Sequence, residues 1–167
     1  MSIIKVLPDN LVNQIAAGEV VERPASVVKE LVENSIDAGA DQIVIEAKTG
    51  GKTLVRVVDN GKGMNRDDAE NSLLRHATSK IIQESDLWNI STMGFRGEAL
   101  ASISSVSQMV LRTKTSGGRA GTEIICDGGE VKTIQDCGMK DGTSIEVNNL
   151  FFNTPARGNY LKKDSTE

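Results

Sequence analysis

Three polar residues in one stretch have the types and the spacing that could activate water beside a metal ion. Glu30 and Asn34 are four positions apart and Asp37 follows nearly one turn later, so in a helix the three share one face. A carboxylate can accept a proton from water, and an amide oxygen can bind a hard cation such as Mg²⁺. Taken alone, this stripe is more typical of the solvent-exposed face of an ordinary amphipathic helix.

Glycine-flanked residues occur at two further places. Asp59 ends a β-rich run and is followed by Gly61 and Gly63, so its carboxylate lies beside backbone that a ligand could approach closely. Residues 94–100 carry two glycines before an expected helix start, where free N–H groups and the helix dipole favour an anion. An ordinary turn and a glycine-rich linker are the respective alternatives.

The elements that would position these residues follow from hydrophobic spacing. Gly39 suits the left-handed position after a helix end, and between residues 24 and 38 apolar residues recur at the spacing of one helix face, at Val27, Val28, Leu31, Val32 and Ile36. We expect further helices at 67–76 and 98–105, a lid or irregular segment at 81–93, and strands at 42–49, 54–58, 108–113, 122–126, 130–134 and 143–147. The order predicts one α+β domain over residues 1–167, a two-layer sandwich with helices on one face of a mostly antiparallel, mixed sheet.

Composition excludes several classes of protein. The 167 residues are 38% hydrophobic and 25% charged, and no apolar run is long enough to span a membrane, so we expect a cytoplasmic protein. A net charge of −4 and an aromatic content of 3% argue against a nucleic-acid-binding surface on this segment. Cys126 and Cys137 are too few for a zinc–thiolate site, and we expect reduced, partly buried thiols. The phosphate-binding sequences of Rossmann and P-loop folds do not occur.

Taken together and in this order, the motifs resemble those of the GHKL ATPase superfamily, whose members include gyrase B-type topoisomerases, heat-shock chaperone ATPases, sensor histidine kinases and MutL. The motifs are E-x-x-x-N-x-x-D-A at 30–38, D-x-G-x-G at 59–63, G-x-x-G at 94–97 and G-T at 142–143. Three longer runs narrow the resemblance to MutL-type DNA mismatch repair proteins, and they lie at 13–21, 94–100 and 152–157. The resemblance covers essentially the whole chain and implies the GHKL, or Bergerat, ATP-binding fold.

The resemblance also implies a role for individual residues, with ATP and Mg²⁺ as the cofactors. Glu30 would be the general base that activates the attacking water, and Asn34 would bind Mg²⁺. Asp59 would accept a hydrogen bond from the exocyclic amine of adenine, and Thr143 would support that contact directly or through water. These four residues would make the site an ATPase centre that prefers ATP to GTP.

Further ATP-binding residues are implied at the phosphates and around the pocket. Thr78, Ser79 and Lys80 match the lid that contacts the phosphates, with a polar helix end as the alternative. Asp37 and Gly63 would shape the pocket. The phosphate loop itself would comprise Phe95, Arg96, Gly97, Glu98, Ala99 and Leu100.

For the intact protein, the resemblance implies a slow, nucleotide-driven switch. ATP binding would order the lid and an N-terminal arm at residues 1–22 and pair two domains as a homodimer, and a MutS-type protein and DNA would be the partners. In such proteins a lysine from a second domain completes the site, and we expect that domain to begin after residue 167, so this chain alone should hydrolyse ATP poorly. The alternatives are a nucleotide-gated dimerisation module without meaningful hydrolysis, and a histidine kinase ATP domain, which would need a phosphoacceptor helix.

Overall fold

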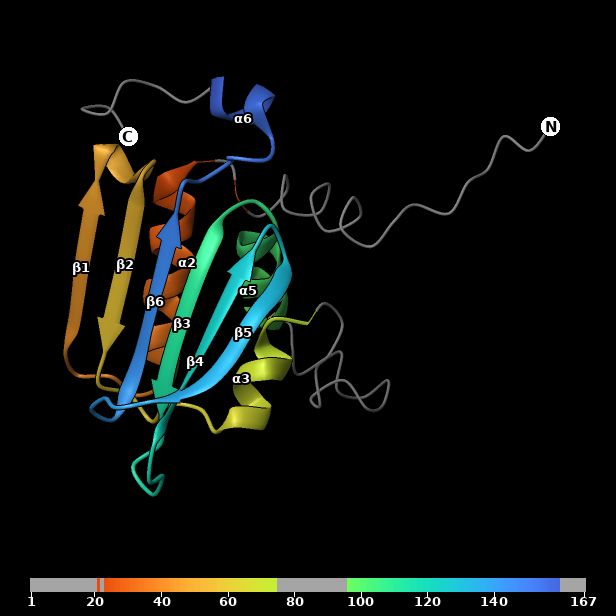
Figure 1. Cartoon of the computed structure of the whole chain (residues 1–167). Helices are drawn as coiled ribbons and strands as arrows, with labels where there is room; N and C mark the ends of the chain where they lie inside the picture. Colours follow the sequence, from red (N-terminus) through yellow and green to blue (C-terminus); the bar gives the residue numbers. More distant parts are fainter. Residues whose placement is uncertain (1–20, 22, 75–95, 160–167) are drawn as a thin grey trace, which may run out of the picture.

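The computed structural model describes residues 21, 23–74 and 96–159, apart from the side chains of residues 96–98, 157 and 159. Their core is one antiparallel sheet of six strands, in the order β1-β2-β6-β3-β4-β5 (Figure 1). The strands are β1 Ile43–Lys48, β2 Leu54–Asp59, β3 Gln108–Lys114, β4 Gly121–Asp127, β5 Glu130–Cys137 and β6 Gly142–Asn148. The last strand is therefore inserted between the second and the third, which brings the end of β2 beside the start of β6.

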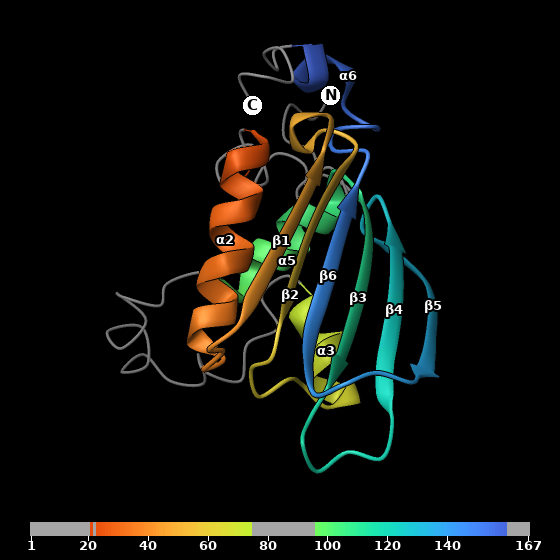
Figure 2. The same ribbon diagram turned by 90° about the vertical axis from the view of Figure 1, so that its left-hand side faces the viewer.

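Helices pack on one face of this sheet, as Figures 1 and 2 show from two sides. They are α2 Pro24–Asp37, α3 Arg66–Ser72 and α5 Arg96–Ser105, while the short α6 Pro155–Asn159 lies beyond the end of the sheet and a 3-10 turn, Thr49–Gly51, joins β1 to β2. The α+β, two-layer prediction is confirmed, although every neighbouring pair of strands in the sheet is antiparallel. That residues 1–167 form a single domain stays a prediction. Within the described residues, no helix is long and apolar enough to cross a membrane.

The inner face of the sheet is built in rows, because residues opposite each other on neighbouring strands point to the same side. Two rows are apolar and bury their side chains against α2 and α5. The first contains Val55, Val147, Met109 and Cys126, and the second contains Val57, Ile145, Leu111 and Ile124. The next row consists of Asp59, Thr143, Thr113 and Thr122. We call these four residues the site row, because they form the polar row at which the two apolar rows end.

The outer face of the sheet carries a chain of charged and polar groups, one from each strand. Arg56 contacts Glu46 at 2.7 Å and Glu146 at 2.9 Å. Arg112 continues the chain from Glu146, at 3.8 Å, to Glu123, at 2.6 Å, and Gln135 Nε2 donates to Glu123 at 2.7 Å. The hydrogen bonds from Arg112 and Gln135 lower the pKa of Glu123 below its ordinary value. This outer-face chain links all six strands and comprises Glu46, Arg56, Glu146, Arg112, Glu123 and Gln135.

Candidate functional site

Helix α2 carries the predicted catalytic stripe and begins and ends as its sequence predicts. Pro24 starts the first turn, and Gly39, with φ of +76°, follows the last turn. Val27 and Leu31 face the sheet and are buried, but Ile36, which the apolar spacing assigned to the buried side, is 60% exposed. Its place on the buried face is taken by Ser35, which is only 2% exposed. Helix α2 therefore presents a buried hydroxyl, that of Ser35, near its C-terminal end, where it can take part in a site.

Glu30 and Asn34 lie on adjacent turns of α2 and are both half-buried, whereas Asp37 ends the helix and is exposed. The structure therefore brings Glu30 and Asn34 together on one flank, as the spacing predicted. Ser35 follows Asn34 directly in α2, and its hydroxyl contacts the carboxylate of Asp59. Glu30 and Asn34 are therefore not on a fully solvated face, whereas Asp37 is exposed.

The carboxylate of Asp59 is held by two donors at the end of β2. Ser35 Oγ lies 2.7 Å from Oδ2, and the backbone N–H of Gly61 donates to Oδ1 at 2.9 Å. The Lys62 N–H also donates to the carbonyl of Ala38 at 2.9 Å, so the loop after β2 is fastened to the end of α2. Each carboxylate oxygen has a second lone pair that a ligand donor can use. Sequence reasoning missed Ser35; its only signal is a hydroxyl four positions after the buried Leu31.

Both glycines of the D-x-G-x-G motif are required for steric reasons. A Cβ on Gly61 would lie 2.8 Å from the Cβ and the carbonyl oxygen of Ala38. Gly63 has φ of +68°, and a Cβ there would overlap the carbonyl oxygen of Lys114. These glycines do allow a close approach, as expected, but the groups that come close are those of Ala38 and Lys114 in this chain. It fixes the loop that follows Asp59 between α2 and β3.

Thr143 lies beside Asp59 in the site row and is 9% exposed. Its hydroxyl oxygen lies 2.9 Å from that of Thr113, which is fully buried. The Thr113 oxygen also accepts from the Met64 N–H at 2.8 Å and lies 3.1 Å from the carbonyl oxygen of Gly142. Sequence reasoning missed Thr113, although the alternation of buried residues through Met109 and Leu111 would have placed it on the inner face.

The predicted phosphate loop lies only partly within the described residues. Helix α5 begins at Arg96, two residues earlier than the predicted helix, and the side chains of Ala99 and Leu100 are buried at 2% and 7% exposure. Those two side chains pack in the core, so only their backbone could face a ligand. The predicted contacts outside the described residues are Thr78, Ser79, Lys80 and Phe95, and at Arg96, Gly97 and Glu98 only the backbone is described.

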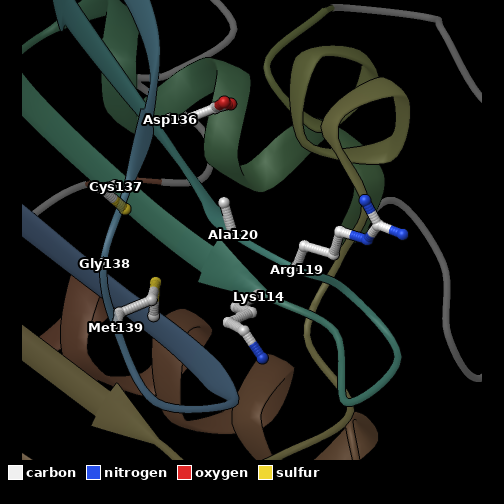
Figure 3. A pocket seen from close by; sticks show the side chains of 7 residues that line it. All are labelled: Lys114, Arg119, Ala120, Asp136, Cys137, Gly138 and Met139. Atoms are coloured by element: carbon white, nitrogen blue, oxygen red, sulfur yellow. The ribbon is translucent and has the colours of Figure 1, made fainter.

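A hollow of about 360 Å³ lies where β3 ends, β4 begins and β5 ends (Figure 3), at the same edge of the sheet as the site row. Lys114 comes one residue after the inward-facing Thr113, so it faces the outer side of the sheet. None of the lining residues is a predicted nucleotide contact; they are Lys114, Arg119, Ala120, Asp136, Cys137, Gly138 and Met139.

Both cysteines are free, and burial raises the pKa of Cys126 to about 11. Among the described residues, no group of three or more His, Cys, Asp and Glu could hold a metal ion.

The residues present fit an adenine nucleotide with Mg²⁺. Asp59 offers a fixed carboxylate and Thr143 a hydroxyl at the polar edge of the core, which suits the hydrogen-bonding edge of a purine. Asn34 offers one amide oxygen, and Mg²⁺ typically takes one or two protein oxygens beside phosphate and water. Glu30 lies one turn away, where it could contact a water on the metal side.

Comparison with known proteins agrees with this geometry. Residues 22–141 match the family described as histidine kinase-, DNA gyrase B- and HSP90-like ATPases. The DNA mismatch repair protein MutL of Geotalea uraniireducens (strain Rf4) is 59% identical over 98% of this chain, and that of Geobacter sulfurreducens is 55% identical over the same share. In both relatives the matched region is 27% of the protein, so the chain spans about a quarter of their length.

A solved structure gives the same assignment. The Aquifex aeolicus MutL ATPase domain complexed with ADP superimposes with a TM-score of 0.70 and 39% sequence identity, over 88% of this chain and 50% of that one. Helix α2, which holds Ser35, and the loop after Asp59 lie within the matched residues 22–141, and β6, which carries Thr143, follows directly after them. The chain therefore belongs to the histidine kinase-, DNA gyrase B- and HSP90-like ATPase family, within its MutL branch.

Proposed function

We propose that this chain binds ATP together with Mg²⁺ and hydrolyses it slowly, as the nucleotide switch of a DNA mismatch repair protein. The observation that carries the proposal is the Asp59 carboxylate, held by Ser35 Oγ at 2.7 Å and the Gly61 N–H at 2.9 Å. The ADP complex of the Aquifex aeolicus relative supports the same ligand class.

Asp59 and Thr143 select the base in this proposal. The free lone pairs of Asp59 accept from the exocyclic amine of adenine, whereas guanine would present a carbonyl oxygen to the same carboxylate. An acceptor facing an acceptor costs binding energy, so the site prefers ATP to GTP. Asp37 and Gly63 shape the pocket on either side, through the end of α2 and the loop after β2.

Glu30 and Asn34 act on the phosphate side. Mg²⁺ neutralises phosphate charge when it is bound, and the Asn34 amide oxygen holds it without adding negative charge. Glu30, one helical turn away, orients a water and accepts its proton. The backbone of residues 95–100 and the side chains of Thr78, Ser79, Lys80, Arg96 and Glu98 are proposed to contact or surround the phosphates.

The role in the intact protein is also a proposal. The relatives are named as DNA mismatch repair proteins, and this chain spans about a quarter of their length. We propose that ATP binding pairs two copies and that the intact protein works with a MutS-type partner and DNA in the cytoplasm. We propose that the DNA-binding surface lies outside this segment, because its net charge of −4 is unfavourable for binding phosphates.

Hydrolysis by a Glu30→Ala variant tests the proposal in the full-length protein that carries this chain. The variant should bind ATP within a few-fold of the wild-type affinity, while its single-turnover hydrolysis falls by about 10²–10⁴-fold, the usual contribution of a general base. Glu33→Ala, which changes a carboxylate on the same helix, is the matched control and should hydrolyse ATP normally. Equal losses of affinity and rate in Glu30→Ala would make Glu30 a binding or folding residue instead.

A further inference from the structure

Thr113 and Thr143 form a buried hydroxyl pair in the site row, and only one member was expected from the motifs. Their oxygens are 2.9 Å apart, and either can be the donor. Thr113 is fully buried, whereas Thr143 is 9% exposed and adjoins Asp59 on the next strand. Thr143 is therefore the member that a ligand can reach, and Thr113 acts on a ligand only through it.

Counting protons gives this pair two hydrogen-bonded arrangements. The Thr113 oxygen accepts from the Met64 N–H at 2.8 Å, so its own proton goes either to the Gly142 carbonyl, at 3.1 Å, or to Thr143. In the first arrangement Thr143 donates to Thr113 and offers only lone pairs to the site. In the second arrangement Thr113 donates to Thr143, and the Thr143 proton is free to be donated into the site.

We propose that Thr113 is a specificity-determining residue of the nucleotide site, because the hydrogen bond from its hydroxyl holds the Thr143 hydroxyl in the orientation that donates to the base. The inference rests on the proposed function, in which Asp59 accepts from the exocyclic amine of adenine. The neighbouring atom on that edge of the base, N1, is an acceptor in adenine. Thr143 lies next to Asp59 in the site row and meets N1 directly or through one water, in the second arrangement, in which Thr113 donates to it and orients its proton.

The same hydroxyl fixes the pocket wall. Its contact with the Met64 N–H ties the loop that follows Asp59 to β3, next to the point where Gly63 packs on Lys114. Thr113 is thus a positioning residue for both base-reading groups. A role in base reading and a role in loop packing differ in one respect, because only base reading depends on the N1 atom of the ligand.

The experiment compares the binding of ADP with that of 1-deaza-ADP, which keeps the amine and replaces N1 by C–H. Calorimetry on the wild type should show ADP binding about fivefold more tightly, the factor that one hydrogen bond contributes. In Thr113→Val the Thr143 hydroxyl keeps its proton but loses the partner that orients it, so this ratio should fall, and Thr113→Ser should restore it. Thr122→Val changes the next buried hydroxyl of the site row and should keep the wild-type ratio.

The possible outcomes separate this inference from the proposed function. If Thr113→Val weakens both nucleotides by the same factor and keeps the ratio, Thr113 is only structural and the inference is wrong. A wild type that binds both nucleotides equally also overturns it, while a wild type that binds neither overturns the proposed function itself. If Thr113→Val does not fold, Thr113→Cys retains a weak acceptor for the Met64 N–H but is a poor donor to Thr143, and a wild-type ratio there contradicts the inference.

Discussion

At the scale of single residues, Gly142 shows how closely the strands meet at the site. It has φ of +128°, and a Cβ there would overlap the Asp59 carbonyl oxygen and lie 3.0 Å from the Cα of Asn60. The first residue of β6 therefore has to be glycine for Asp59 and Thr143 to stand side by side. The G-T pair, which said nothing by itself in the sequence, acquires a steric meaning from this contact.

Gly142→Ala should consequently damage both the fold and the site. We expect a loss of about 1–3 kcal/mol in the free energy of unfolding, because the backbone is strained for alanine and β2 and β6 have to separate. ADP affinity should fall with it. The control is Gly117→Ala in the β3–β4 turn, where nothing lies within 4 Å of the added Cβ. Urea unfolding that gives equal stability for both variants would contradict the steric account.

Residue types alone predicted part of this site. Asp59 and Thr143 were identified from their motifs, and the structure places them side by side in the site row. Ser35 and Thr113 were missed, because a hydroxyl has no distinctive spacing and its importance depends on what lies across the tertiary contact. The functional roles of these residues stay proposals until they are measured.

At the scale of elements, periodicity located α2 and the strands, but it could not give their order in the sheet. Ile36 was wrongly expected on the buried face of α2, because the end of this helix faces the polar edge rather than the apolar rows. The insertion of β6 between β2 and β3 depends on long-range pairing, which local sequence does not encode. The outer-face chain was missed for the same reason.

The outer-face chain predicts a pH dependence of stability through Glu123. Its pKa is lowered chiefly by the hydrogen bond from Arg112 and then by that from Gln135. A carboxylate with a lowered folded-state pKa stabilises the fold above its unfolded pKa and loses that contribution as the pH falls through the folded pKa. Glu123→Gln should therefore cost about 1 kcal/mol at neutral pH, and the difference from the wild type should shrink as the pH falls below the ordinary pKa of a glutamate and vanish only below the lowered folded-state pKa of Glu123.

Urea unfolding at several pH values measures this difference. The matched control is Glu130→Gln on β5, whose side chain is 74% exposed in its ion pair with Lys132 and should contribute less than about 0.5 kcal/mol. A Glu123→Gln difference that persists unchanged into acid would show that the outer-face chain does not act through the charge of Glu123.

At the scale of the whole molecule, the site is where three distant parts of the chain meet. Ser35 comes from α2, Asp59 from the end of β2 and Thr143 from the start of β6, and the sheet order brings them together. The apolar rows beside them provide a rigid, water-excluding base on which the polar edge rests. We therefore expect nucleotide binding to require the whole folded sheet, because no single motif contains all three of these residues.

The most direct test of this account is ADP and ATP binding by an Asp59→Asn variant of this chain, measured by calorimetry. Asparagine keeps the shape of the side chain but presents an amide to the adenine amine, and we expect affinity to fall by about 5- to 150-fold, with a still larger loss in Asp59→Ala. Asp127→Asn, at the end of β4, is the control, because it changes another strand-ending aspartate on a strand two places from β6 in the sheet. Selective loss of binding in Asp59→Asn, with the wild type preferring ATP to GTP, is the predicted result. Wild-type ATP affinity in Asp59→Ala would contradict the account.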